Sequence, residues 1–201
     1  MKNGKMKNVN VIKKNIDDAF EYVRESRNYI YVVIGFFIFF VIVGFFIVPL
    51  NTELSEMLDK SLRDILLRAE GLSGLRLILF IFVNNVTVAF AGIFFGILLG
   101  IYPLFSSIVN GAVLGYVFAK VNALSGISQF WKILPHGIFE LPAVFISLGI
   151  GLKLGTFIFS KNVGHEVKYR FVNSIKVFLF IIIPLLIVAA VIESFLILLF
   201  K

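Results

Sequence analysis

The longest uncharged stretch of the chain is its most restrictive feature. Between Arg76 and Lys120 lie 43 residues, 77–119, and none of them is charged. About 20 apolar residues suffice for a helix to cross the hydrocarbon core of a membrane, so this stretch is twice the length of one span. The sequence Gly-Ile-Tyr-Pro at 100–103 is the one turn signal near its middle. The stretch therefore predicts two membrane-spanning helices, about 75–99 and 104–119, joined as a tight hairpin.

Three further apolar segments complete this pattern. No charged residue occurs from Asn28 to Thr52, and we predict spans at about 29–50, 133–152 and 177–199. The chain is 59% hydrophobic and 15% charged, whereas a soluble domain has about 45–50% apolar and 25% charged residues. The predicted fold class is all-α: a polytopic membrane helix bundle of about five transmembrane helices plus an N-terminal amphipathic surface helix. If segment 133–152 is instead re-entrant, both ends of the chain lie on one side of the membrane.

Two other segments have the apolar spacing of amphipathic helices. The basic tail, 1–28, has apolar residues three or four positions apart: Val9, Ile12, Ile16, Phe20 and Val23. It predicts a helix on the membrane surface, with a partly ordered basic tail as the alternative. The segment 53–70 has a narrow apolar stripe between charges of alternating sign: Leu54, Leu58, Leu62, Ile65 and Ala69. We predict an external helix here, capped by Asn51 or Thr52 and ended by Gly71.

Positive charge is concentrated in two places. The tail and the segment 161–176, which we interpret as a basic loop, together hold eleven Lys and Arg residues. The positive-inside rule then places the N-terminus in the cytoplasm and Lys201 outside, with the bundle, 29–201, in the cell membrane. The net charge of +7 predicts anionic membrane lipid as a partner. It does not indicate nucleic acid, because the basic residues lie where a membrane protein carries them.

Glycines recur at four-residue spacing in the predicted hairpin. Gly92, Gly96 and Gly100 form a double G-x-x-x-G on the second span, and Gly111 and Gly115 form another on the third. Because such a stripe has no side chains, helix backbones can approach closely and pack by van der Waals contact. The pattern indicates a tight bundle, and it also suits partner proteins or a homo-oligomer.

Six polar residues fall within the predicted spans: Asn84, Asn85, Asn110, His136, Glu140 and Glu193. A charged side chain in hydrocarbon costs about 2.5–3.5 kcal/mol on insertion scales, so these groups should face the bundle interior. His136 and Glu140 lie one turn apart on one helix face. The rise per residue places Glu140 and Glu193 in the same half of the membrane. We predict a shared site for a cation, a proton or a small polar solute, with a structural polar network as the alternative.

Three of these residues also suit a metal centre. His136, Glu140 and Glu193 offer one imidazole and two carboxylates, a set that can hold a divalent cation such as Zn²⁺ with one position open. The sequence has no H-E-x-x-H, G-x-S-x-G or Walker A motif, so an enzyme is the least supported interpretation.

The stretch Leu134–Ala143 contains the block P-H-G-x-x-E, which resembles that of the stage II sporulation protein M family. Three other pieces are similar to this family and follow its order: Asn84-Asn85, Asn110-Gly111 and 189–193. The resemblance covers about residue 29 to the end and implies a multi-pass membrane protein, with archaeal chains among its relatives. It also implies that His136, Glu140 and Glu193 belong together. The sporulation role of the namesake is not transferred to this chain.

Three functions fit these patterns. The first is a permease or channel-like subunit whose intramembrane polar site handles a cation, a proton or a small polar solute. The second is a non-catalytic scaffold that recruits partners through its glycine faces, its tail and the 53–70 helix. The third is a metal-dependent intramembrane enzyme. We expect the first.

Overall fold

The computed structural model describes residues 2–126 and 134–199, with side chains for 10–126, 137–138 and 140–196. Throughout the described residues the chain is helical or in short connections, without a strand. The α-helices are α1 (Lys2–Glu25), α2 (Arg27–Phe46), α3 (Thr52–Ala69), α4 (Gly74–Phe94), α5 (Ile101–Ser125), α6 (Leu134–Gly155), α7 (Val163–Val177) and α8 (Ile183–Leu199). Short 3₁₀ turns follow α2, α4 and α6: η1 (Val48–Leu50), η2 (Phe95–Ile97) and η4 (Thr156–Phe159).

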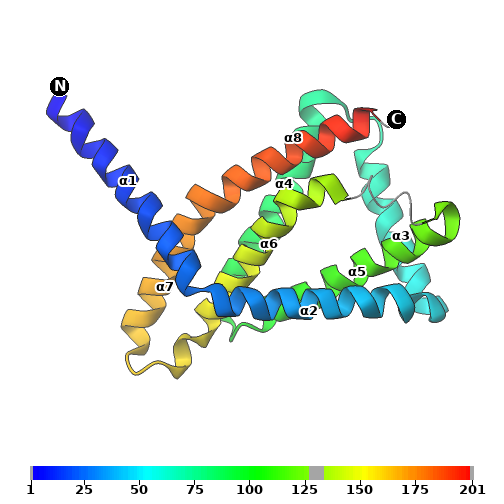
Figure 1. Ribbon diagram of the computed structural model, residues 1–201, viewed down its shortest axis with the longest axis horizontal. Coiled ribbons are helices and arrows are strands. Elements are labelled where there is room, and N and C mark those ends of the chain that lie inside the picture. The colour runs from blue at the N-terminus through cyan, green and yellow to red at the C-terminus, as the bar shows by residue number, and fades with distance from the viewer. Residues whose placement is uncertain (1, 127–133, 200–201) are drawn as a thin grey trace.

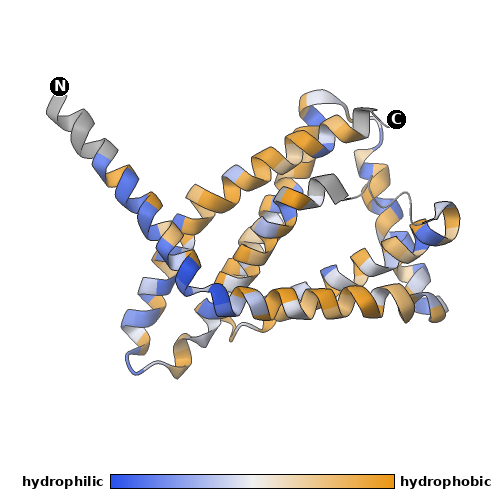
Figure 2. Cartoon of the chain, viewed as in Figure 1, coloured by the Kyte–Doolittle hydropathy of each residue, from blue (hydrophilic) through white to orange (hydrophobic). Residues whose placement is uncertain are grey.

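Five helical segments are long and apolar enough to cross a membrane. They are Arg27–Leu50, Gly74–Ile97, Ile101–Ser125, Glu140–Phe159 and Val163–Leu196. This confirms the predicted all-α polytopic bundle with an additional N-terminal helix. Apolar residues cover α2 and α8 almost continuously, whereas α1 and α3 carry both polar and apolar residues (Figure 2), as expected for helices outside the hydrocarbon layer.

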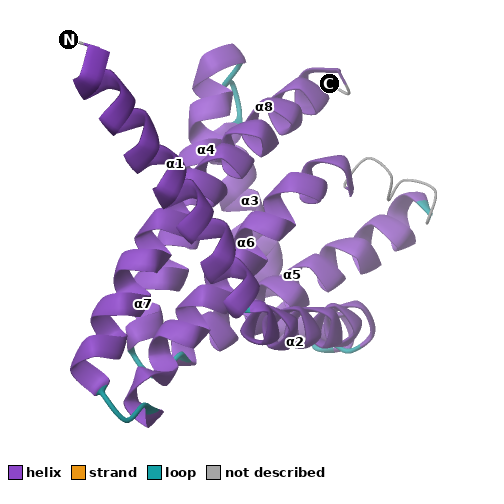
Figure 3. Ribbon diagram, turned by 60° about the vertical axis from the view of Figure 1, so that its left-hand side comes forward, coloured by secondary structure: helices purple, strands orange, loops and turns teal. Residues whose placement is uncertain are grey.

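The spans form two groups that diverge from a common end (Figures 1 and 3). One group is the pair α2 and α5, and the other contains α4, α6 and α8. The groups meet where Ile30 of α2 packs on Gly149 of α6. α3 lies near the opposite end, where the two groups are farther apart (Figure 1).

The pair of α2 and α5 is held by glycines. A Cβ atom on Gly111 would meet the backbone of Phe37, and one on Gly115 would meet the backbone of Val41. The hydroxyl of Ser107 donates a hydrogen bond of 2.8 Å to the carbonyl of Val33 in the same interface. The two backbones are therefore in direct contact, and any side chain at these positions would separate them.

The second group also packs through glycines, but the predicted stripe on the second span is interrupted. Gly92 faces Ser147 and Leu148 of α6, and Gly96 faces the backbone of Gly151. Because α4 ends at Phe94, Gly96 lies in η2 and Gly100 lies beyond it, in the turn before α5. Gly100 has a φ of 71°, in the left-handed region that glycine tolerates best. Gly100 is thus a turn residue that contacts Leu152, and not part of a continuous helical stripe.

Most of the segment 161–176 belongs to the helix α7, Val163–Val177, which corrects its interpretation as a basic loop. α7 begins after Asn162, whose side chain accepts a hydrogen bond from the backbone N–H of His165. It continues into α8 through a π-helical turn, Phe178–Ile182. The sequence did not predict this helix, because the segment has too few apolar residues between its charged ones to show a helical periodicity.

α1 packs its C-terminal half against α7, at the end of the bundle opposite α3 (Figure 1). The contact face contains Ala19 and Tyr22, both buried, whereas Phe20 of the predicted stripe is 59% exposed. Lys176 pairs with Asp18 at 2.6 Å. Burial raises the pKa of the Tyr22 phenol well above its ordinary value, so it stays neutral. Phe20 of the predicted stripe therefore lies outside the contact face, whereas Val23 packs against the buried cluster that contains Ala19 and Tyr22.

Candidate functional site

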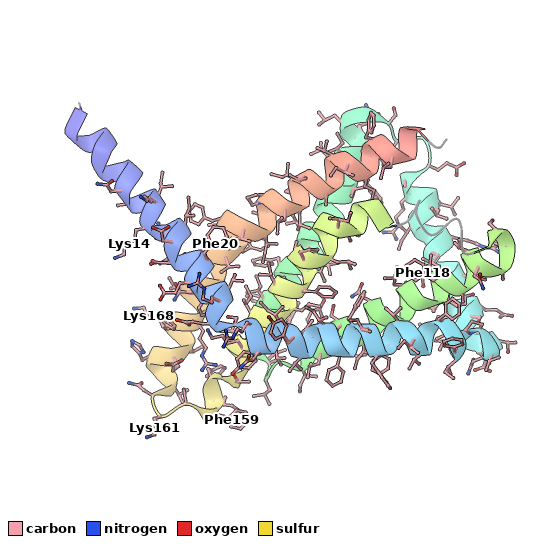
Figure 4. All side chains as sticks on the ribbon, in the orientation of Figure 1. Lys14, Phe20, Phe118, Phe159, Lys161 and Lys168 are labelled. Atoms are coloured by element: carbon pink, nitrogen blue, oxygen red, sulfur yellow. The ribbon has the colours of Figure 1, made fainter. Side chains whose placement is uncertain are left out.

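A cavity of about 400 Å³ lies between the two helix groups. Residues of α2, α3, α4, α5, α6 and α8 line it, including Phe118, which Figure 4 labels on α5. The lining side chains are mainly apolar: Phe37, Leu62, Ile65, Phe80, Ile81, Val113, Leu114, Val117, Phe118, Leu141 and Val144. The polar lining residues are Asn84, Asn85, Asn110, Glu140 and Glu193.

Five of the six polar residues singled out from the sequence thus line one space. Asn84 and Asn85 come from α4, Asn110 comes from α5, and the carboxylates of Glu140 and Glu193 come from α6 and α8. Four helices therefore direct amides and carboxylates into the same cavity. Each position lies within a segment that is apolar enough to span the membrane, which makes their convergence a functional-site hypothesis by default.

The amides form hydrogen bonds with their own helices. Asn84 Nδ2 donates to Asn85 Oδ1 at 3.3 Å, and Asn110 Nδ2 donates to the backbone oxygen of Ser106 at 2.7 Å. These bonds use the amide nitrogens of Asn84 and Asn110, and among the described residues none donates to the side-chain oxygens of these two, which can accept from a ligand or water.

The two carboxylates differ from the amides because nothing described compensates their charge. Within the part of the chain that the structure describes, neither Glu140 nor Glu193 accepts a hydrogen bond or forms a salt bridge. Both groups line the same cavity, so a charge on one disfavours a charge on the other. No lysine, arginine or histidine is among the described side chains that line the cavity. Two acceptors of this kind in an apolar surrounding attract a cation or a proton.

His136 lies in α6, one turn before Glu140, but its side chain is outside the described residues. Among the described side chains, no group of three His, Cys, Asp or Glu residues is placed to hold a metal ion. The metal set of His136, Glu140 and Glu193 therefore stays a prediction.

The walls of the cavity were not foreseen from the sequence. Leu62 and Ile65 of α3 line it, although the sequence indicated only that they belong to an apolar stripe. The apolar stripe was the one sequence signal for this contact, because the apolar face of an amphipathic helix packs against another apolar surface. What it covers depends on tertiary packing.

α3 is fastened to both helix groups. Asn51 caps it, accepting a hydrogen bond from the backbone N–H of Leu54, as one of the two predicted caps. Asp59 accepts a hydrogen bond of 2.8 Å from the hydroxyl of Tyr116 on α5 and pairs with Lys120. At the other end, Ala69 packs against a buried cluster formed by α4 and α8. α3 thus bridges the two groups beside the cavity.

This attachment predicts a pH dependence. Hydrogen bonds from Lys120 and Tyr116 hold the pKa of the Asp59 carboxyl below its ordinary value of about 3.9. A carboxyl whose pKa is lower in the folded state contributes stability above its unfolded pKa and loses it as the pH falls through the folded pKa. We expect α3 to lose hydrogen-exchange protection below about pH 4, measured by mass spectrometry.

Matched variants on α3 isolate this effect. Asp59→Asn should show the weakened protection already at pH 6, because the amide lacks the charge that attracts Lys120. Asp64→Asn, on the same helix, should behave like the unmodified chain, since Asp64 has no ion-pair partner among the described residues. Equal protection in the two variants would contradict the role of Asp59.

A second groove, of about 540 Å³, lies at the other end of the molecule between α1 and α7. Its lining includes Lys14 and Lys168, which lie on the same edge of the molecule as Lys161 (Figure 4). It also includes Asp18 and Glu21, and Asp18 is already paired with Lys176. The mixed charges make this groove a junction between helices and a less specific candidate than the polar cavity.

Comparison with known proteins gives a family and one relative of unknown role. The family model described as stage II sporulation protein M matches residues 33–196. An uncharacterised protein of the archaeon Methanocaldococcus jannaschii is 37% identical over 126 residues, which cover 60% of this chain and 55% of the relative. The match thus spans about half the length of that relative. No solved structure matches the chain.

Proposed function

This chain belongs to the stage II sporulation protein M family, and we propose that it is a permease-like membrane subunit that binds a cation in its polar cavity. The observation that supports this proposal best is the pair of carboxylates, Glu140 and Glu193, without a described partner in an otherwise apolar cavity. Uncompensated charges at membrane depth are costly, and proteins retain them where they bind or move a solute.

The scaffold alternative has less support. It names the glycine faces, the tail and the 53–70 helix as surfaces for partners, but Gly92, Gly111 and Gly115 pack against other helices of the same chain. A partner helix could use these faces only by displacing α2 or α6. The packing of these glycines therefore supports ligand binding in the cavity over recruitment of partner helices by the glycine faces.

The proposal includes an orientation and a lipid partner. α1 and α7 lie together at the end opposite α3, so the tail and the segment 161–176 carry their basic residues on one side. The positive-inside rule assigns this side to the cytoplasm of a cell membrane. Lys14, Lys161 and Lys168 then face the anionic lipid surface, each contributing about 1 kcal/mol to its attraction.

A cation-binding cavity must admit water, and thiol labelling tests this directly. The chain has no cysteine, so Val113→Cys places a single thiol in the wall of the cavity. We expect this thiol to react at least about tenfold faster with a membrane-impermeant methanethiosulfonate in proteoliposomes than a thiol in lipid, because only the hydrated thiolate is reactive.

Ile38→Cys is the matched control. Ile38 is 54% exposed on α2 and does not line the cavity. Its neighbour Phe37 contacts Gly111 of α5, so the two thiols lie at about the same level of the bundle. Equal and slow labelling of the two variants would mean that the cavity is dry, and the proposal would then be wrong.

A further inference from the structure

We infer that the ligand of the polar cavity is an organic ammonium ion with apolar substituents, and not a bare inorganic cation. The inference rests on the proposed function and names its ligand class. Three features of the cavity carry it: its size, the arrangement of its walls and its connection to the outer face of α4.

The size of the cavity exceeds what a single ion needs. Its volume is about 400 Å³, whereas one water molecule occupies about 30 Å³ in the liquid. A metal ion requires several oxygen or nitrogen ligands at roughly 2.0–2.6 Å. A space that holds many ligand atoms is instead typical of sites for small organic molecules, which begin near about 300 Å³.

The walls provide two different environments. Glu140 and Glu193 supply negative charge, and Asn84 and Asn110 offer side-chain oxygens beside them. Most other lining residues are aliphatic or aromatic, as a ligand with an apolar portion requires. Phe80 is among them, and a phenyl face attracts a cation. The positive charge of an ammonium ion with hydrocarbon substituents would pair with the glutamates, and its substituents would pack against the apolar walls.

The cavity also adjoins a groove on the outer face of α4, whose lining is mainly apolar but includes Arg76. This groove has a volume of about 670 Å³ and shares Phe80 and Asn84 with the cavity. Leu79 and Val83, which line it, are 50% and 58% exposed. In a membrane this face adjoins lipid, so a ligand with an apolar portion can reach Asn84 from the bilayer. A strongly hydrated inorganic ion cannot use such a route.

Thermal unfolding of the full chain in detergent tests the ligand class. The probes are the chlorides of benzyltrimethylammonium, tetramethylammonium, ammonium and sodium at equal ionic strength, and those of magnesium and zinc. We expect benzyltrimethylammonium to raise the unfolding midpoint, at a half-maximal concentration at least about tenfold below that of ammonium. The Glu140→Gln/Glu193→Gln variant in the same detergent should show no rise, which excludes an effect on the micelle.

The outcomes separate this inference from the proposed function. If sodium, magnesium or zinc stabilises the chain as well as benzyltrimethylammonium does, and the two glutamates are required, the inference is wrong and the cation site stands. If no cation stabilises the chain, the inference is wrong, and slow labelling of Val113→Cys then removes the proposed function as well. Stabilisation by neutral benzyl alcohol equal to that by benzyltrimethylammonium would also overturn the inference.

Discussion

Gly115→Ala is expected to lower the free energy of unfolding by about 1–3 kcal/mol, the usual cost of overpacking a close interface. The added methyl group would meet the carbonyl oxygen of Val41 and the backbone nitrogen of Phe45. Both are backbone atoms of α2, so neither can rotate away as a side chain would. The gain of about 1 kcal/mol from the better helix propensity of alanine offsets part of this cost.

Gly35→Ala is the matched control for that prediction. Gly35 lies on α2 as well, but a Cβ atom there would have no neighbour within 4 Å. We expect this variant to be as stable as the unmodified chain, or more stable by up to about 1 kcal/mol, through helix propensity alone. Denaturant unfolding in mixed micelles, followed by circular dichroism, gives both values. Equal stability of the two variants would show that α2 and α5 are not in backbone contact.

Hydropathy and glycine spacing were sufficient to predict the five spans and their close packing, but not the helix α7. Both signals are local, because the length of an uncharged run and a four-residue spacing are read within one segment. Which helices the glycines join was not predictable in this way. Gly92 packs on Ser147 and Leu148, and Gly111 on Phe37, and these partners are set by how the whole chain turns.

The turn at Gly100 shows a second limit. The four-residue spacing assigned this glycine to the helical stripe, whereas the Gly-Ile-Tyr-Pro sequence at 100–103 assigned it to a turn. Leu99 and Gly100 both adopt positive φ angles, which confirms the turn. Glycine serves helix packing and tight turns equally well, so spacing alone does not distinguish them. The neighbouring Pro103 favoured the turn, because proline is tolerated in the first turn of a helix, here α5.

The candidate site was more predictable than its walls. Polar side chains in apolar spans are rare enough to be noticed one at a time, and the cost of exposing them to lipid directs them inward. That reasoning selected Asn84, Asn85, Asn110, Glu140 and Glu193, all of which line the cavity. Apolar residues such as Val113 give no such signal, since they fit lipid, helix interfaces and cavity walls equally well.

The second large effect concerns the two carboxylates. Replacing both, as Glu140→Gln and Glu193→Gln, is expected to raise the stability of the ligand-free chain by about 1–3 kcal/mol. The reason is that a charged group without a partner carries a larger burial penalty than a neutral polar group, and the amide removes this excess. An amide has nearly the same shape, so the substitution removes the charge and the mutual repulsion without leaving a void.

The same variant should lose its response to cations. A ligand present at about 100 times its dissociation constant stabilises the folded chain by about 2.7 kcal/mol, and this contribution should vanish with the carboxylates. Glu53→Gln, in the first turn of α3 and outside the cavity lining, should retain it. If the double variant is more stable than the unmodified chain and no longer responds to cations, the two glutamates form a binding site. In a structural network the same substitutions would lower the stability, because they remove partners. If the double variant is less stable and still responds to cations, the two glutamates serve the fold and the cation binds elsewhere.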